Sequence, residues 1–158
     1  MRWFGVAVLA GCGATKDGGT GAGASGCEPG SGPTVTIGTG ERGFEPMPDE
    51  VELVHGPQGG YHVVVAFDAQ LLDASEVVFG VVDGTIDGEV VATSEPYLDM
   101  RCNPDTGTLQ ASGVLLIYPL TPEALADQPT RITATLTDSF GGVATGSVET
   151  TIVDPLID

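Results

Sequence analysis

Apolar and polar residues alternate over much of the second half of the chain. In residues 130–138, isoleucine, alanine and leucine at every second position alternate with arginine and threonine. This period of two is typical of a β-strand with one buried face. A Gly-Gly pair at 141–142 is followed by a second alternating run over residues 143–153. The two runs predict a hairpin that closes the fold.

Runs of β-branched residues that are apolar on both faces occur upstream, at residues 61–67 and 77–82. Such runs are expected of central strands in a sheet. Asp83-Gly84 and Asp87-Gly88 are turn dipeptides, and they predict the turn into the next strand. Further strands are predicted at residues 34–38, 51–55, 89–94 and 109–118, the last after a turn at 103–107.

One segment has the pattern of a short helix. Pro122 follows Thr121 and opens the run Glu-Ala-Leu-Ala-Asp up to Asp127. A threonine before the helix and a proline at its first position are both favourable. Residues 122–127 therefore predict one or two helical turns.

Seven or eight short strands with one helical turn predict an all-β, immunoglobulin-like Greek-key sandwich over residues 34–158. An open β-barrel is the alternative architecture. The end of the chain, with its helical turn, threonine-rich strand, turn and final strand, resembles bacterial immunoglobulin-like and fibronectin-type modules. This resemblance covers about the last 50 residues and implies the fold alone. The sequence departs from antibody domains, because it has no tryptophan after Trp3 and no tyrosine in residues 130–138.

The first twelve residues have a different character. An apolar run from Trp3 to Ala10 is much shorter than the roughly 20 residues of a membrane-spanning helix. It ends in Leu9-Ala10-Gly11-Cys12, which resembles the lipobox of bacterial lipoproteins. The resemblance implies cleavage before Cys12 and anchoring through diacylglycerol and acyl chains such as palmitate. The alternative is a plain secreted protein.

These patterns divide the chain into a signal peptide at residues 1–11, a lipidated tether at 12–33 and a β-domain at 34–158. The tether is rich in Gly, Ser and Ala, and is expected to be a spacer. Its Gly21-Ala-Gly-Ala-Ser-Gly26 matches a dinucleotide-binding motif in letters only, because the sequence predicts no strand before it. In enterobacterial lipoproteins an aspartate after the lipidated cysteine retains the protein at the inner membrane, so the resemblance, with Gly13 at that position, implies the outer membrane.

If lipid occupies Cys12, two cysteines remain, Cys27 and Cys102. Outside the cytosol, an even number of cysteines favours a disulfide. We therefore expect a Cys27–Cys102 bridge, with two free thiols as the alternative.

The charge of the chain restricts its partners. There are 22 acidic residues against 5 basic ones, for a net charge of −17. Such a protein repels phosphate backbones, so we expect no nucleic-acid binding. Contact with a membrane is expected through the lipid on Cys12, and a protein or cell-wall partner remains open for a domain that is expected to be monomeric.

Candidate metal ligands are few. His55 and His62 flank a Gly-Pro-Gln-Gly-Gly segment, where a loop that brought them together with Met47 or Met100 would suit copper or zinc. The competing interpretation is a structural loop. Three carboxylates between residues 83 and 89 suggest calcium, but their spacing differs from that of an EF-hand.

Catalytic motifs are missing from the sequence: it contains no GxSxG, HExxH or CxxC. We therefore expect no enzyme activity and no cofactor. The main hypothesis is a lipid-anchored cell-envelope protein with a non-enzymatic binding or structural module. The alternatives are a periplasmic copper- or zinc-binding protein that uses His55 and His62, and a hydrolase whose residues form no recognised motif.

Overall fold

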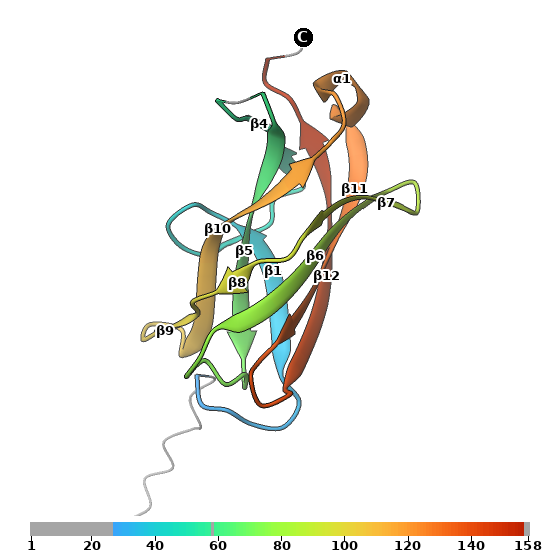
Figure 1. The fold of residues 1–158 in the computed structure, drawn as a ribbon. Coiled ribbons are helices and arrows are strands. Elements are labelled where there is room, and N and C mark those ends of the chain that lie inside the picture. The colour runs from blue at the N-terminus through green and yellow to red at the C-terminus, as the bar shows by residue number, and fades with distance from the viewer. Residues whose placement is uncertain (1–26, 58, 157–158) are drawn as a thin grey trace, which may run out of the picture.

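A computed structural model describes residues 27–57 and 59–156. These residues form two β-sheets packed face to face, with one short helix at one end (Figure 1). The predicted all-β sandwich is therefore confirmed. Cys12, the predicted signal peptide and the first part of the predicted tether lie outside the described residues. Within the described part of the chain, no helix is long and apolar enough to cross a membrane.

The first sheet has the strand order β2-β1-β5-β10-β9, and β4 pairs with β5 in addition. All of its pairings are antiparallel. Its strands are β1 (Thr34–Thr39), β2 (Glu45–Pro46), β4 (Val54–His55), β5 (Tyr61–Gln70), β9 (Arg101–Asn103) and β10 (Thr108–Tyr118).

The second sheet has the order β3-β12-β11-β6-β7, and β8 pairs with β6 in addition. Its pairings are antiparallel except for β3, which runs parallel to β12. Its strands are β3 (Glu50–Glu52), β6 (Val78–Ile86), β7 (Glu89–Ser94), β8 (Tyr97–Leu98), β11 (Gln128–Thr137) and β12 (Val143–Val153).

The strand orders are those of an immunoglobulin-like Greek key. The sequence β1-β5-β10-β9 corresponds to strands A-B-E-D of that fold, and β6-β11-β12 corresponds to C-F-G. Seven of the twelve described strands have six or more residues, and these carry the predicted architecture. The other five have two or three residues, and they account for the larger total.

The core lies between the sheets, where the alternating pattern placed it. Ile132, Ala134 and Leu136 of β11 are fully buried and face the first sheet. Val65 and Phe67 of β5 are also fully buried and face the second sheet. Burying this apolar surface is the main stabilising contribution to such a sandwich.

One predicted turn is wrong. Asp83-Gly84 lies inside β6, and only Asp87-Gly88 turns the chain, with positive φ angles of 52° and 85°. A Cβ atom at position 84 would lie 2.5 Å from the hydroxyl oxygen of Tyr118. Gly84 therefore allows close packing between the sheets, which local turn statistics do not detect.

The helix α1 (Pro122–Leu125) begins where it was predicted, with proline in its first turn. The hydroxyl group of Thr121 makes no capping hydrogen bond. The helix ends at Leu125, two residues before the predicted end, and Asp127 then adopts a positive φ of 61°.

Candidate functional site

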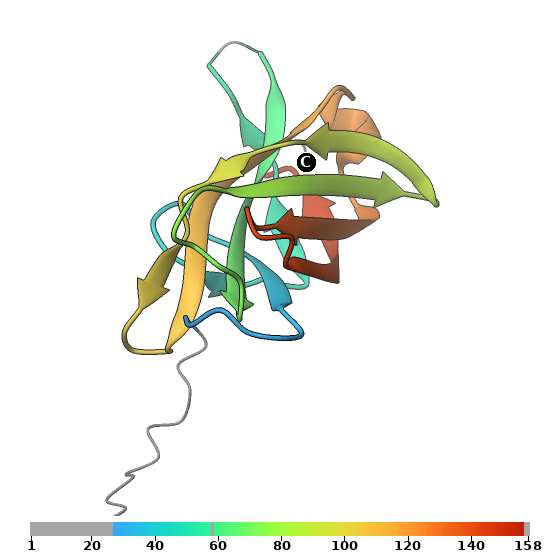
Figure 2. The same ribbon diagram turned by 60° about the horizontal axis from the view of Figure 1, so that its bottom comes forward.

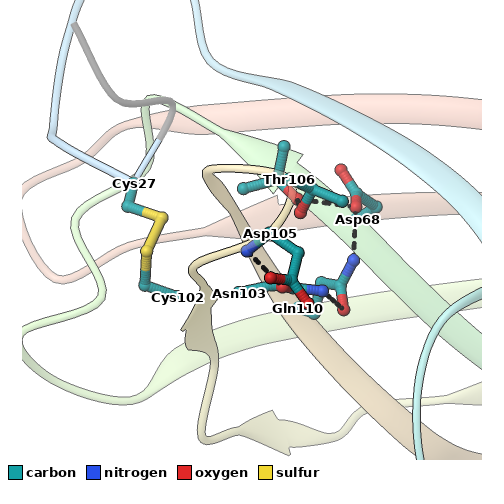
Figure 3. The surroundings of a disulfide bond; sticks show 8 residues. Cys27, Asp68, Cys102, Asn103, Asp105, Thr106 and Gln110 are labelled. Carbon is teal, nitrogen blue, oxygen red and sulfur yellow. Dashed lines mark hydrogen bonds between the residues drawn. A yellow bond between two sulfur atoms is a disulfide. The ribbon is translucent and has the colours of Figure 1, made fainter. Parts of the chain in front are cut away.

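The predicted disulfide between Cys27 and Cys102 is present, with the two Cα atoms 5.6 Å apart (Figure 3). It joins the segment before β1 to the short strand β9. Strands β1 and β9 are separated by β5 and β10 in the first sheet, so Cys27 lies beside the edge strand that is remote from β1. The bond therefore fastens the start of the domain to its far edge.

A chain of polar contacts holds the β9–β10 hairpin beside this disulfide (Figure 3). Asp68 of β5 accepts hydrogen bonds from the Thr108 hydroxyl and the Gln110 amide, both at 2.7 Å. Gln110 in turn accepts one from the Asn103 amide at 3.0 Å. Asn103 accepts a further one from the backbone N–H of Asp105 at 2.9 Å. These bonds fix the wall against which the neighbouring groove is built.

That groove, which we call the side groove, encloses about 680 Å³ between residues 94–103 and the bulged part of β10. Arg42 and Arg101 both line it. They are two of the three arginines in the described part of the chain. The side groove therefore holds two of the few positively charged side chains of this acidic protein.

The polar groups of the side groove suit an anionic ligand. Arg101 contacts Asp99 at 2.7 Å, and both side chains are largely exposed to solvent, so the pair is weak and open to exchange. Arg42 has no ion-pair partner among the described residues. A guanidinium group binds carboxylates and phosphates with two parallel hydrogen bonds. Tyr97 is 79% exposed at the rim and offers a face for stacking.

The backbone of β10 shapes the inner wall of the side groove. Beyond its three pairs with β9, this strand pairs only with β5. A bulge between Ala111 and Val114 includes Gly113, which has a φ of 73°. The Gly113 N–H donates to the carbonyl oxygen of Gly40 at 2.9 Å. This bond draws the loop that carries Arg42 against the strand.

The structure does not bring the two histidines together. His55 lies opposite Tyr61 in the β4–β5 ladder, and His62 lies opposite Val54. Because neighbouring residues of a strand point to opposite faces, the two imidazoles occupy different sides of the sheet. The ring of His55 meets the Asp154 carboxylate at 2.8 Å and the ring of Tyr61 edge-on.

The other suggested ligands are also engaged elsewhere. Met100 is buried in the core, and Met47 packs against the core. Asp83 accepts a hydrogen bond from the Thr93 hydroxyl at 2.6 Å. Among residues 27–57 and 59–156, no three His, Cys, Asp or Glu side chains are grouped as metal ligands.

Two buried carboxylates have perturbed acidity. Burial by itself would raise the pKa of Asp138, but hydrogen bonds from the N–H groups of Asp73, Gly142 and Phe140 outweigh it and lower the pKa. Burial likewise opposes the lowered pKa of Asp154, which the Leu156 N–H and His55 produce. Both carboxylates accept backbone hydrogen bonds in loops at the ends of strands. These bonds explain the lowered pKa values without a catalytic role.

The side groove could not be predicted from the sequence, because Arg42 and Arg101 come from distant elements and are isolated in their own segments. No model of a protein family matches the sequence, and no curated protein matches it significantly.

Proposed function

We propose that this chain is a lipoprotein of the bacterial cell envelope, anchored through Cys12, whose β-sandwich is a non-enzymatic binding module. The observation that carries the proposal is the use of the three cysteines. Cys27 is paired with Cys102, and this leaves Cys12, at the end of the lipobox-like sequence, as the cysteine for acylation. Structural disulfides persist outside the cytosol, in the compartment where lipoproteins reside. Gly13 favours the outer membrane.

The binding module is proposed to use the side groove. Arg42 and Arg101 give it the charge to attract carboxylate or phosphate groups, which the rest of the surface repels. The hydrogen-bonded hairpin beside it provides a rigid wall, so that little order has to be imposed when a ligand binds. A carboxylate-bearing protein or cell-wall component fits this chemistry.

The non-enzymatic part of the proposal is supported by the positions of the titratable groups. Asp138 and Asp154 have lowered pKa values, yet each already takes part in hydrogen bonds with its own loop and with a second segment of the chain. Neither residue lines the side groove. A catalytic acid or base has to reach a substrate, and these two carboxylates are already committed.

Anchoring is tested by the intact mass of the protein purified from its native membrane. We expect a chain that begins at Cys12 and carries the added mass of acyl groups. A chain that retains Met1 and carries no acyl group would refute the anchoring.

Binding at the side groove is tested by titrating the protein with citrate, a small carboxylate, in ¹H–¹⁵N correlation spectra. We expect shifts at Arg101, Gln110 and their neighbours that an Arg42→Gln/Arg101→Gln variant loses. Arg131→Gln is the matched control, because Arg131 pairs with Glu149 on the other sheet. Equal shifts in both variants would exclude the groove as the site.

A further inference from the structure

Three segments of the chain meet at one end of the sandwich. The N–H of Gly30 donates to the carbonyl oxygen of Leu71 at 3.0 Å. Two residues later in that loop, the N–H of Asp73 donates to the Asp138 carboxylate at 2.9 Å. We call this the entry end, and define it as residues 27–33, 71–77 and 138–143. Figure 1 shows it beneath the sheets, where the described chain begins, and in Figure 2 the same end is turned toward the viewer.

The entry end exposes three apolar side chains. Phe140 is 74% exposed, Val77 52% and Val143 50%. Exposed apolar side chains on a highly charged protein call for an explanation when they gather at one place. Here they gather where the chain enters the domain.

The turn that carries Phe140 is fixed in place. The carboxylate of Asp138 accepts hydrogen bonds from the N–H groups of Phe140 at 3.0 Å and Gly142 at 2.7 Å. The Gly141 N–H also donates to the carbonyl oxygen of Asp138. Phe140 is therefore presented outward by a rigid backbone, and a contact made there loses little conformational entropy.

The position of the anchor suggests what covers this end. Cys12 and Cys27 are separated by 15 positions in the sequence. Even a fully extended chain of that length spans at most about 50 Å. The entry end is thus the part of the domain that the anchor holds nearest to the lipid, and the disulfide keeps it there by tying Cys27 to β9.

We infer that the entry end docks on the surface of the membrane that holds the anchor, with Phe140 in the interfacial layer and Val77 and Val143 beside it. This inference rests on the proposed lipidation of Cys12. Aromatic side chains favour the interface between headgroups and acyl chains. The exposed carboxylate of Glu76 lies at the same end, as do those of Glu28 and Asp73. The partner is therefore a zwitterionic lipid surface, since an anionic one would repel these groups.

Tryptophan fluorescence tests this orientation. Trp3 precedes the proposed cleavage site, so Phe140→Trp gives residues 12–158 a single tryptophan. Because Cys27 and Cys102 are paired, the thiol of Cys12 can be coupled selectively to a maleimide lipid in phosphatidylcholine vesicles. We expect the emission of Trp at 140 to shift to the blue and to be quenched by brominated phosphatidylcholine. Tyr97→Trp, an equally exposed position on the side groove, is the matched control and should show neither effect.

The outcomes separate the docking from the lipidation. The docking would be overturned if the emission of the Phe140→Trp variant were the same with and without brominated lipid. It would also be overturned if brominated lipid quenched the Tyr97→Trp variant equally. Replacing half of the phosphatidylcholine by phosphatidylglycerol should reduce the quenching, and unchanged quenching would overturn the choice of a zwitterionic surface. Because the lipid is coupled chemically, these results do not depend on whether the native protein is acylated. Acylation itself is decided by the intact mass of the native protein.

Discussion

Replacing Tyr118 by phenylalanine should stabilise the protein. Tyr118 is 2% exposed, and its hydroxyl group makes no hydrogen bond with any described residue. The ring itself fills the core next to Leu116 and Gly84. The substitution therefore removes a buried polar group and keeps the apolar packing.

The size of the gain follows from the cost of burying a hydroxyl group without a partner, about 1–3 kcal/mol. The small space left beside Gly84 offsets part of it, so the free energy of unfolding should rise by about 1 kcal/mol. For a domain of this size, that corresponds to an increase in Tm of about 4 °C. Urea unfolding followed by circular dichroism measures the change, with the slope m unaltered.

The advantage of phenylalanine should grow at alkaline pH. Burial raises the pKa of Tyr118 well above its ordinary value. Below about pH 10 the residue is neutral in both the folded and the unfolded state, and its contribution does not depend on pH. Above that value the unfolded chain loses the proton while the folded protein keeps it, so the stability of the wild type falls by about 1.4 kcal/mol per pH unit through this group. The Tyr118→Phe variant lacks this loss.

The matched control is Tyr97→Phe, because Tyr97 is largely exposed. That change should alter the free energy of unfolding by no more than about 0.5 kcal/mol at any pH below 9. A Tyr118→Phe variant that unfolds at lower urea concentration than the wild type would refute the reasoning, since it would mean that the hydroxyl group contributes a favourable contact.

Three further changes have defined outcomes. Replacing Cys27 and Cys102 together by serine opens a loop of 75 residues, and chemical denaturation should show a loss of about 4 kcal/mol. Asp138→Ala leaves three backbone N–H groups without their acceptor and should lower the free energy of unfolding by about 2 kcal/mol in the same assay. Because the pKa of Asp138 is lowered in the folded protein, its stabilising contribution is present above the pKa of the unfolded chain and is lost as the pH falls through the folded pKa. The stabilities of the wild type and the variant should therefore converge in acid. Gly84→Ala forces a Cβ atom against the Tyr118 hydroxyl, so it should lower the free energy of unfolding by about 1–3 kcal/mol and Tm by several degrees. Combining it with Tyr118→Phe should recover part of that loss.

The sequence predicted the long strands well because each has a face that must be buried. In β11 the alternation of Ile132, Ala134 and Leu136 with polar residues fixes both the strand and its orientation. β8 and β9 were not predicted, because strands of two or three residues are too short to show a period. They form through pairing with β6 and β10, which the local sequence does not encode.

Site predictions depended on proximity in the sequence, and this is a poor guide in a sheet. His55 and His62 are close along the chain, but strand alternation separates them onto different faces. Arg42 and Arg101 are far apart in sequence and line one groove, because the Gly40–Gly113 hydrogen bond holds the loop of Arg42 against β10 and the strand of Arg101 pairs with β10. The disulfide was predicted correctly, since the number of cysteines, and not their spacing, determined that prediction.

The disulfide also determines how the domain responds to a pull along the chain. Over residues 34–37, β1 pairs within its sheet only with β5, so force applied at its start would peel it away one hydrogen bond at a time. Because Cys27 is bonded to Cys102, the same force passes also into β9 and through the Asp68 network into β10 and β5. Several strands then have to yield together, and hydrogen bonds loaded in parallel resist more force than bonds that break in sequence. A bond between the entry segment and the far edge of the sheet is therefore well placed to bear the load that the proposed anchoring through Cys12 would apply.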